Sequence, residues 1–504
     1  MSKPMKKPAT KSPPKAPRQK PIESVAFVSL GCPKNLVDSE RMLGLLASDG
    51  LSITPDHNAA DAIVINTCGF LEASKTESMA EIRQAVELKK QGKVQRVIVA
   101  GCLVQRHKTK LLADEPGIDK LVGVFDREHI VEAVRGQDNP NSDHGHYLGK
   151  YHDLSKELAA HQLPSASTAR QTKTSRLPVF EDDRARLRLT PRHYAYLRIS
   201  EGCNQGCAFC TIPSIRGPMR SKPIERILVE AKELAADGAV ELNLIGQDTT
   251  SFGTDIGYGP GLSGLLSALD KKLKDVEWIR LMYAYPSCFT DDMIKTIADS
   301  PRIVKYIDMP LQHISDRMLQ VMKRRVTRKE IETLLEKLRK WVPGITIRTT
   351  FIAGSPTETE AEHKELVKFV RDFGFDMMGV FPFSPEPGTP MGRIEEQHSE
   401  KTKAKWVEEL MLVQQEVAFA RAKALRGSTI RVLVDRPASR NPDEDGYVAR
   451  HTGQAPDIDS HTLVKAPGLY AGQMLDVEVL GADGYDLFAA PHKPKSRSLK
   501  VVKA

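Results

Sequence analysis

Six short β-branched segments alternate with six amphipathic segments between residues 191 and 425, and this alternation limits the possible folds more than any other feature of the chain. An apolar period near two indicates a strand, and a period near 3.6 indicates a helix. Repeated strand–helix units of this length predict a parallel sheet that closes, fully or partly, into a barrel. The predicted strands are Tyr194–Ile199, Val240–Ile245, Trp278–Tyr283, Val304–Met309, Ile345–Ile352 and Met377–Phe383. The predicted helices are 223–237, 261–273, 290–299, 314–323, 328–341 and 358–373.

The segments on either side of this region have different patterns. Residues 23–136 also alternate strands with helices, which predicts a separate open parallel α/β domain. Residues 426–491 hold five short strands between Gly, Pro and Asp residues, which predicts a small antiparallel β-barrel. Residues 137–190 are rich in Asn, Ser, Thr and Asp, and we interpret them as a linker with one short helix near 152–161. The remaining predicted elements are strands Val25–Leu30, Ala62–Asn66 and Arg96–Ala100, helices 36–49, 72–91 and 397–425, and strands Ile430–Val434, Tyr447–Ala449, Leu463–Lys465, Met474–Val479 and Leu487–Ala489.

Positive charge is concentrated at the two ends of the chain. The net charge is +8, but residues 1–22 contribute +7 and residues 492–504 contribute +5, so the remainder carries −4. We expect both tails to be disordered, and either contact with RNA or simple solubility accounts for their charge. No apolar segment follows the basic start, and none approaches the roughly 18 residues that span a membrane. We therefore expect a cytoplasmic protein.

Three cysteines within eight residues are the strongest chemical signal. Cys203, Cys207 and Cys210 have the spacing C-x3-C-x2-C. A cubane iron–sulfur cluster has four irons, so three cysteine ligands leave one iron free to bind a small molecule. Zinc is the weaker alternative, because structural zinc takes a fourth Cys or His at close spacing and the nearest histidine, His193, lies ten residues upstream. Seven cysteines, an odd number in 504 residues, also disfavour a disulfide framework.

Three further cysteines occupy equivalent positions in the 23–136 domain. Each follows one predicted strand, at Cys32, Cys68 and Cys102. Ligand sites of open parallel sheets gather outside the carboxyl ends of the strands. A glycine stands beside each cysteine, at Gly31, Gly69 and Gly101, which lets the backbone approach a bulky group. A single free cysteine is often only a small buried residue, but three such placements predict a second three-cysteine cluster.

The spacing of Cys203, Cys207 and Cys210 resembles the radical S-adenosylmethionine (radical SAM) superfamily, in which the aromatic residue before the third cysteine, here Phe209, lies near the adenine. A three-cysteine α/β domain, a radical SAM barrel and a small barrel called TRAM, in that order, resemble the methylthiotransferases over about residues 23–135 and 190–490. The stretches 29–40, 66–71, 246–250 and 306–315 are similar to the RimO branch of that family. The MiaB branch, which acts on tRNA adenosine, typically has Gly-Cys-Gln-Met-Asn where this chain has Gly-Cys-Pro-Lys-Asn. The basic N-terminal extension and the 137–190 insert depart from the family pattern.

The resemblance implies a partial (β/α)6 barrel, two [4Fe-4S] clusters and S-adenosylmethionine. It implies that one cluster cleaves the cofactor to a radical, which takes hydrogen from the β-carbon of an aspartate in the twelfth small-subunit ribosomal protein. The methylthio group would come from the cluster at Cys32, Cys68 and Cys102, so both clusters must face one cavity. The implied partners are the ribosomal protein or the ribosome and an electron donor such as flavodoxin or ferredoxin. We expect a monomer.

Weaker candidates lie at the carboxyl ends of the barrel strands, where barrel chemistry collects. The candidates for cofactor binding are Phe209, Gln247, Asp248, Thr350, Gly354 and Arg216. Arg216 is a candidate to neutralise a carboxylate of the cofactor or substrate, and a solvated loop is the alternative. We interpret His313 as a satisfied histidine and Cys288 as structural, and we predict no catalytic residue beyond the cluster ligands. Two other functions stay open: the same chemistry on tRNA, and a non-catalytic metal-binding RNA or ribosome adaptor.

Overall fold

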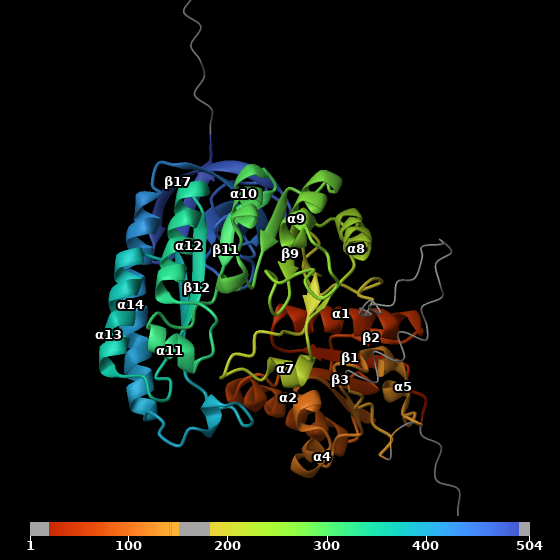
Figure 1. Ribbon diagram of the computed structural model, residues 1–504. Coiled ribbons are helices and arrows are strands. Elements are labelled where there is room, and N and C mark those ends of the chain that lie inside the picture. The colour runs from red at the N-terminus through yellow and green to blue at the C-terminus, as the bar shows by residue number, and fades with distance from the viewer. Residues whose placement is uncertain (1–19, 141, 143, 151–181, 493–504) are drawn as a thin grey trace, which may run out of the picture.

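The computed structural model of the chain describes residues 20–140, 142, 144–150 and 182–492 (Figure 1). The short helix predicted near 152–161 lies outside these residues. Two parallel sheets and a closed barrel follow one another along the chain, and a two-stranded ribbon lies beside the second sheet. No helix in the described part of the chain combines the length and apolar character needed to cross a membrane.

The N-terminal sheet is parallel and has five strands in the order β2-β1-β3-β4-β5. Its strands are β1 (Ser24–Ser29), β2 (Ser52–Thr54), β3 (Ala62–Thr67), β4 (Arg96–Gly101) and β5 (Lys120–Val122). The sequence predicts the three longer strands but misses β2 and β5, because three residues are too few to establish an apolar period. The strand order reverses between β1 and β3, and ligands of open α/β sheets bind at such a point.

Helices cover both faces of this sheet. One layer contains α1 (Pro33–Ser48), η1 (Arg127–His129) and α5 (Ile130–Arg135), and the other contains α2 (Glu72–Lys90), α3 (Cys102–His107) and α4 (Lys110–Asp114). Met42 and Leu46 of α1 pack against one face of the sheet. Met79 and Ile82 of α2 pack against the other face. α1 begins three residues earlier than predicted because Pro33 suits the first position of a helix.

The central sheet is the partial barrel, with six parallel strands in the order β13-β12-β11-β10-β9-β6. All six strands predicted for it are present: β6 (Tyr194–Arg198), β9 (Glu241–Ile245), β10 (Trp278–Leu281), β11 (Ile303–Asp308), β12 (Thr346–Ala353) and β13 (Met377–Pro382). Its helices are α7 (Ile212–Arg216), α8 (Ile224–Ala236), α9 (Gly261–Lys272), α10 (Asp291–Asp299), α11 (Asp316–Val321), α12 (Arg328–Trp341) and α13 (Glu360–Phe373). Short elements complete it: β7 (Ser200–Glu201), β8 (Arg220–Ser221), η2 (Pro286–Cys288) and η3 (Met391–Arg393).

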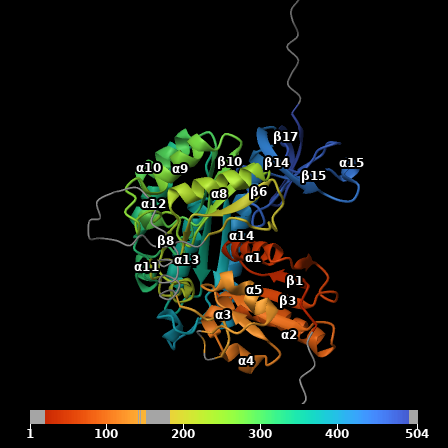
Figure 2. The same cartoon turned by 90° about the vertical axis from the view of Figure 1, so that its right-hand side faces the viewer.

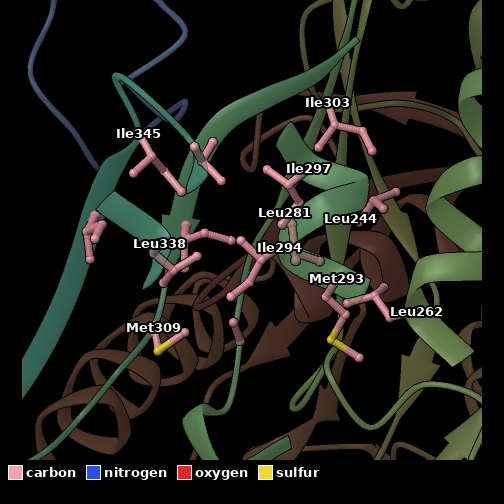
Figure 3. Close-up of a cluster of buried hydrophobic side chains, with 14 of the residues drawn as sticks. Leu244, Leu262, Leu281, Met293, Ile294, Ile297, Ile303, Met309, Leu338 and Ile345 are labelled. Atoms are coloured by element: carbon pink, nitrogen blue, oxygen red, sulfur yellow. The ribbon is translucent and has the colours of Figure 1, made fainter. Parts of the chain in front are cut away.

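Strand side chains alternate between the outer helices and the interior of this barrel. Leu244 and Leu281 point outward and pack with Ile294 and Ile297 of α10 in the main apolar core (Figure 3). The strand residues that alternate with these leucines point into the barrel and are largely polar or aromatic, as Arg280 is. The apolar layer therefore holds the helices, and the interior is left for polar contacts.

A long helix leads from the barrel to the C-terminal domain. α14 (Glu400–Ala424) packs against α13 and β13. The five predicted strands form the closed barrel β14-β15-β16-β18-β17, made of β14 (Thr429–Pro437), β15 (Tyr447–His451), β16 (Thr462–Val464), β17 (Met474–Asp483) and β18 (Asp486–Pro491), with α15 (Pro442–Asp445) between the first two. The prediction of an antiparallel barrel holds for four pairings but is wrong for β16 and β18, which run parallel because a crossover through β17 joins them.

One loop of the C-terminal domain, residues 452–460, contacts the interior side chains of the central barrel. The Asp457 carboxylate accepts hydrogen bonds from the hydroxyls of Tyr194 and Tyr196, at 3.1 and 3.2 Å. Asp459 accepts one from Tyr306 at 2.9 Å. This loop fills one end of the barrel, whereas the N-terminal domain lies at the other end, as the turned view shows (Figure 2). A site shared with the N-terminal domain can therefore lie at that second end.

Candidate iron–sulfur and cofactor site

The carboxyl ends of the strands in the two parallel sheets face each other. Cys32, Cys68 and Cys102, which we call the N-terminal trio, follow β1, β3 and β4. Cys203, Cys207 and Cys210, the barrel trio, follow β6 on the opposite side of the interface. The Lys34 ammonium, two residues after Cys32, lies 3.2 Å from the centroid of the Tyr283 ring, which follows β10. The N-terminal trio therefore lies over the carboxyl end of the central barrel.

Glycines allow the three loops of the N-terminal trio to meet. Gly31 has φ +91°, and a Cβ there would lie 2.7 Å from the Cβ of Cys68 and 3.1 Å from its Sγ. A Cβ at Gly69 would lie 2.7 Å from the Cα of Leu103, the residue after Cys102. Side chains at these positions would separate the cysteines, so the sequence expectation for the glycines agrees with the geometry.

The electrostatic environment of the N-terminal trio favours a cationic ligand. Burial is the main cause that raises the pKa of the Cys102 thiol to about 12. Arg216 opposes this rise, and charge repulsion from Cys32 and Cys68 adds to it, so the three sulfurs lie within electrostatic range of one another. Thiolates in such a place need a positive centre between them. All three cysteines are free of disulfides, and the residues present fit a cluster held by three thiolates.

The barrel trio lies in a loop whose backbone points toward its sulfurs. The N–H of Gln205 donates to Sγ of Cys203 at 3.5 Å, and the N–H of Ile212 donates to Sγ of Cys210 at 3.4 Å. Burial raises the pKa of Cys203 to about 11 and that of Cys210 to about 12, and these N–H groups oppose the rise. N–H donors to sulfur are typical of iron–sulfur sites, so this loop also fits a cluster.

Among the described residues, no three His, Cys, Asp or Glu side chains lie close enough together to bind a single metal ion. In a four-iron cluster each cysteine binds a different iron, so its ligands stand farther apart than those of a single ion. The same finding disfavours zinc at the barrel trio, the alternative left open by the sequence, because the described residues place no three such side chains around one ion.

Arg216 connects the two trios. Its Nη2 donates to Sγ of Cys102 at 3.1 Å, and its Nη1 donates to Asp38 at 2.8 Å and to Glu201 at 3.2 Å. Glu201 stands two residues before Cys203. The guanidinium thus pairs with carboxylates of the protein itself, and its predicted contact with a cofactor or substrate carboxylate stays a prediction.

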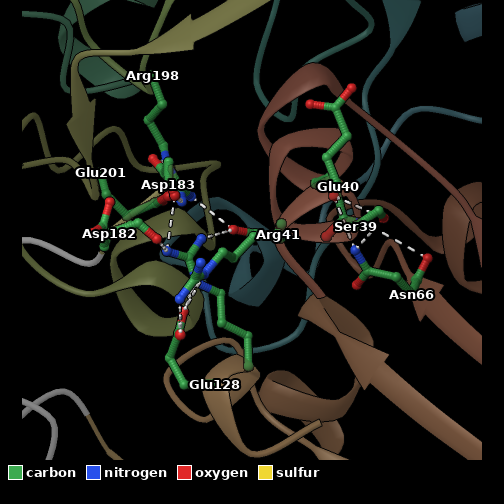
Figure 4. A network of polar contacts seen from close by, with 12 residues as sticks. Ser39, Glu40, Arg41, Asn66, Glu128, Asp182, Asp183, Arg198 and Glu201 are labelled. Carbon is green, nitrogen blue, oxygen red and sulfur yellow. Dashed lines mark hydrogen bonds and ion pairs between the residues drawn. The ribbon is translucent and has the colours of Figure 1, made fainter. Parts of the chain in front are cut away.

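A buried ion network extends from Arg216 across the interface. Asp38 of α1 also accepts hydrogen bonds from Arg127 and Arg198, at 2.6 and 2.8 Å. Asp183 pairs with both of these arginines, and Figure 4 shows it beside Arg198 and Glu201. Asp183 belongs to the segment interpreted as a linker, so residues 182–190 of that segment form part of the interface.

Comparisons with known proteins agree with this arrangement. Three family models match, described as Uncharacterized protein family UPF0004 over residues 24–123, Radical SAM superfamily over 197–370 and TRAM domain over 427–491. The ribosomal protein uS12 methylthiotransferase RimO of Bdellovibrio bacteriovorus is 40% identical over 471 residues, which cover 92% of this chain and 96% of that protein. The RimO of Geobacter sulfurreducens is 38% identical over 465 residues, covering 92% and 98%.

This chain belongs to the RimO family. Its RimO relatives align over nearly their whole length, and the three matched domains occur in the order that the sequence predicted. Among solved structures, the radical S-adenosylmethionine methyltransferase TsrM from Kitasatospora setae matches with a TM-score of 0.49 and 16% identity, over 74% of this chain and 77% of that chain.

Two predicted cofactor residues of this RimO-family chain lie beneath the barrel trio. Asp248 accepts hydrogen bonds from Gln205 Nε2 and the Ser251 hydroxyl, both at 2.6 Å, so it orients the cysteine loop. Gln247 donates through Nε2 to Glu201, while none of the residues that the structure describes forms a hydrogen bond with its buried Oε1. A cofactor contact through Gln247 therefore stays a prediction. The Oε1 atom supports it, because this acceptor can receive a hydrogen bond from a cofactor.

The other predicted residues have structural neighbours. Phe209 packs against a buried cluster that contains Met318 and Met322. Thr350 is half-buried in β12. Gly354 follows that strand, and a Cβ on it would lie 2.5 Å from Cγ of Lys403, so close packing of α14 explains this glycine. No contact of these three residues tests the cofactor role.

Two residues interpreted as structural have internal partners. Nδ1 of His313 accepts from the Ser315 N–H at 3.0 Å, and its Nε2 lies 3.3 Å from Glu358, so this buried histidine is satisfied as predicted. The Cys288 sulfur lies 3.4 Å from Gln205 Nε2 and the Ser251 hydroxyl. It is therefore placed beside the cysteine loop, outside both trios.

Sequence reasoning missed the charged groups that hold the site together. Asp183 and Arg324 lie outside the stretches that resemble the family, and Asp38 lies within one of them, 29–40, but no local pattern indicates which residues pair with it. Asp38 and Arg198, for example, are 160 residues apart. Arg324 lies between two exposed basic residues, Lys323 and Arg325, and the sequence alone does not show that it is the buried one.

Proposed function

We propose that this chain adds a methylthio group to the β-carbon of an aspartate in ribosomal protein uS12, with one [4Fe-4S] cluster at each trio. One observation carries the proposal: two sets of three free cysteines lie at facing edges of two sheets, and Arg216 contacts Cys102 in one and Glu201 beside the other. The RimO relatives, named for this reaction, support the choice of substrate.

The proposed division of labour follows from the geometry. When bound at the barrel trio, the cluster with S-adenosylmethionine supplies the radical that takes hydrogen from an unactivated C–H bond. The chain itself holds the sulfurs with backbone N–H donors and glycine-lined loops. Cys102, Arg216 and Glu201 are all less than a tenth exposed, which limits the access of water to the part of the site between the trios. The positions proposed for cofactor contact are Phe209, Gln247, Asp248, Thr350, Gly354 and Arg216.

The proposal includes two partner classes. The substrate is uS12, alone or in the small subunit, and a one-electron donor of the flavodoxin or ferredoxin class reduces the barrel site. The chain is proposed to act as a monomer.

The test of substrate uses anaerobically purified protein, S-adenosylmethionine and a reductant with either uS12 or tRNA. We expect uS12 to gain the mass of one methylthio group in place of hydrogen, at a single aspartate, and tRNA to stay unmodified. Modification of tRNA alone, with both clusters loaded, would reassign the enzyme to the MiaB-like reaction. A protein that binds zinc and no iron would be a non-catalytic adaptor.

The test of the two sites counts iron. About eight irons per chain follow from two four-iron clusters, and Cys32→Ala should lose about half of them while cofactor cleavage continues. Cys288→Ala is the matched control, because its sulfur belongs to neither trio, and it should keep all the iron. Full iron in Cys32→Ala would remove the N-terminal site from the proposal.

A further inference from the structure

Arg324 lies against the barrel trio and has no role in the family resemblance described above. Its Nη1 donates to Sγ of Cys207 at 3.5 Å, and its Nη2 donates to the carbonyl of Pro310 at 2.6 Å. The guanidinium stacks on the Tyr285 ring, with Cζ 4.0 Å from the ring centroid. The Tyr285 hydroxyl lies 3.8 Å from the same sulfur, and Arg324 is 7% exposed. Cys207 therefore has two donor groups that the rest of the trio lacks.

The end of α11 directs Arg324 inward. The N–H of Arg324 donates to the Leu319 carbonyl at 2.8 Å, and the N–H of Lys323 donates to Gln320 at 2.9 Å, which is the Schellman pattern. Lys323 occupies the left-handed position of this motif, with φ 54°, where glycine is usual. This turn exposes Lys323 and buries Arg324, and it fixes where the guanidinium lies.

The charge of Arg324 differs in effect from that of Arg216. Arg216 pairs with Asp38 and Glu201, so most of its charge at Cys102 is cancelled. In the described part of the chain, no carboxylate lies within ion-pair distance of Arg324, and its partners are a carbonyl, a ring and a sulfur. Its full positive charge therefore acts on the barrel trio.

We propose that Arg324 is a positioning residue that raises the reduction potential of the cluster at the barrel trio and so eases its one-electron reduction. This inference rests on the proposed function, which places a cluster there. Net charge and hydrogen bonds to the sulfurs set the potential of such clusters, and a cation favours the reduced state because that state carries one more negative charge. Tyr285 assists by holding the guanidinium in place.

The experiment is a redox titration followed by electron paramagnetic resonance, in a Cys32→Ala background in which only the barrel cluster should give a signal. Arg324→Gln should lower its midpoint potential by about 59 mV, which is a tenfold lower ratio of reduced to oxidised cluster at a fixed potential. Arg324→Lys keeps a cation but not the fork that spans Cys207 and Pro310, so it should give a smaller drop. Arg325→Gln, the same substitution at the exposed neighbouring arginine, is the matched control and should leave this potential unchanged.

The outcomes separate this inference from the proposed function. An unchanged potential in Arg324→Gln, with the iron of the barrel trio retained, would overturn the role of Arg324 and leave the two-site proposal standing. If Arg324→Gln fails to hold its cluster, an unchanged potential in Arg324→Lys has the same meaning. If instead the Cys32→Ala background keeps all its iron, the two-site proposal fails, and the Arg324 titration still reads the single remaining site.

Discussion

Replacing Asp38 by Asn should loosen the contact between the N-terminal domain and the central barrel. The Asp38 carboxylate is 5% exposed and accepts hydrogen bonds from Arg127, Arg198 and Arg216. An amide of the same shape keeps the packing but removes the negative charge between three cations. A buried charge that loses a partner is costly, and here each of the three arginines would lose one of its carboxylate partners.

The size of the effect follows from the acidity of this carboxyl. Burial tends to raise the pKa of Asp38, but the three arginines outweigh it and lower the pKa from 3.8 to about 2. At 1.36 kcal/mol for each unit of pKa, the charged form contributes about 2 kcal/mol to the folded interface. Loss of that energy should increase the equilibrium constant for opening the interface about 30-fold.

Hydrogen exchange measures this opening at a chosen amide. The N–H of Leu187 donates to the Glu40 carbonyl at 3.0 Å, across the interface between the 182–190 segment and α1. Asp38→Asn should speed exchange of this amide about 30-fold at pH 7. Because the lowered pKa gives stability that is complete above 3.8 and lost toward about 2, the difference should be constant from pH 5 to pH 8 and shrink only below pH 4.

A surface pair in the same domain provides the control. Asp49 pairs with Arg135, and both side chains are more than a third exposed, so Asp49→Asn should change exchange at Leu187 by less than about fivefold. Equal effects of the two variants, or a difference that varies between pH 5 and pH 8, would refute the assignment of the interface energy to Asp38.

Two further predictions concern other parts of the chain. Gly31→Ala should lose the iron of the N-terminal trio and keep that of the barrel trio, because the new Cβ would lie 2.7 Å from the Cβ of Cys68; Gly50→Ala, also at positive φ but with nothing within 4 Å, should keep both, and equal iron in the two variants would contradict the steric argument. Arg450→Met should lower the free energy of unfolding by about 3 kcal/mol, because both Asp435 and the buried Glu241 lose a guanidinium partner, although Glu241 keeps its pairing with Arg280. Calorimetry that finds a change below about 1 kcal/mol would show that this ion pair does not hold the C-terminal domain on the barrel.

The fold could be predicted from the sequence because its signals are local. An apolar period of two or 3.6 residues marks each long strand and helix, and all six barrel strands are confirmed. The missed strands β2 and β5 have three residues each and depend on pairing with longer neighbours. The parallel pairing of β16 with β18 is a property of topology, which no period within either strand records.

The candidate site could be predicted only as far as its cysteines. Their spacing and their positions after strands are visible in the sequence, and the structure brings each trio to an edge of its sheet. The groups that hold the trios in place, such as Arg216 on Cys102, depend on contacts between distant segments. Asp183 illustrates the limit, because the composition of its segment indicates a linker while its carboxylate lies buried among three cations.

The two trios differ in how much of the chain must be folded before they exist. The cysteines of 203–210 lie within eight residues, so they can gather metal on a chain that is still being synthesised. Cys32, Cys68 and Cys102 meet only when β1, β3 and β4 are paired, because each follows a different strand. If both trios bind clusters as proposed, the N-terminal site can be filled only after its sheet has formed, whereas the barrel site can be filled earlier. A shortage of iron during growth should therefore affect the two sites at different stages of folding.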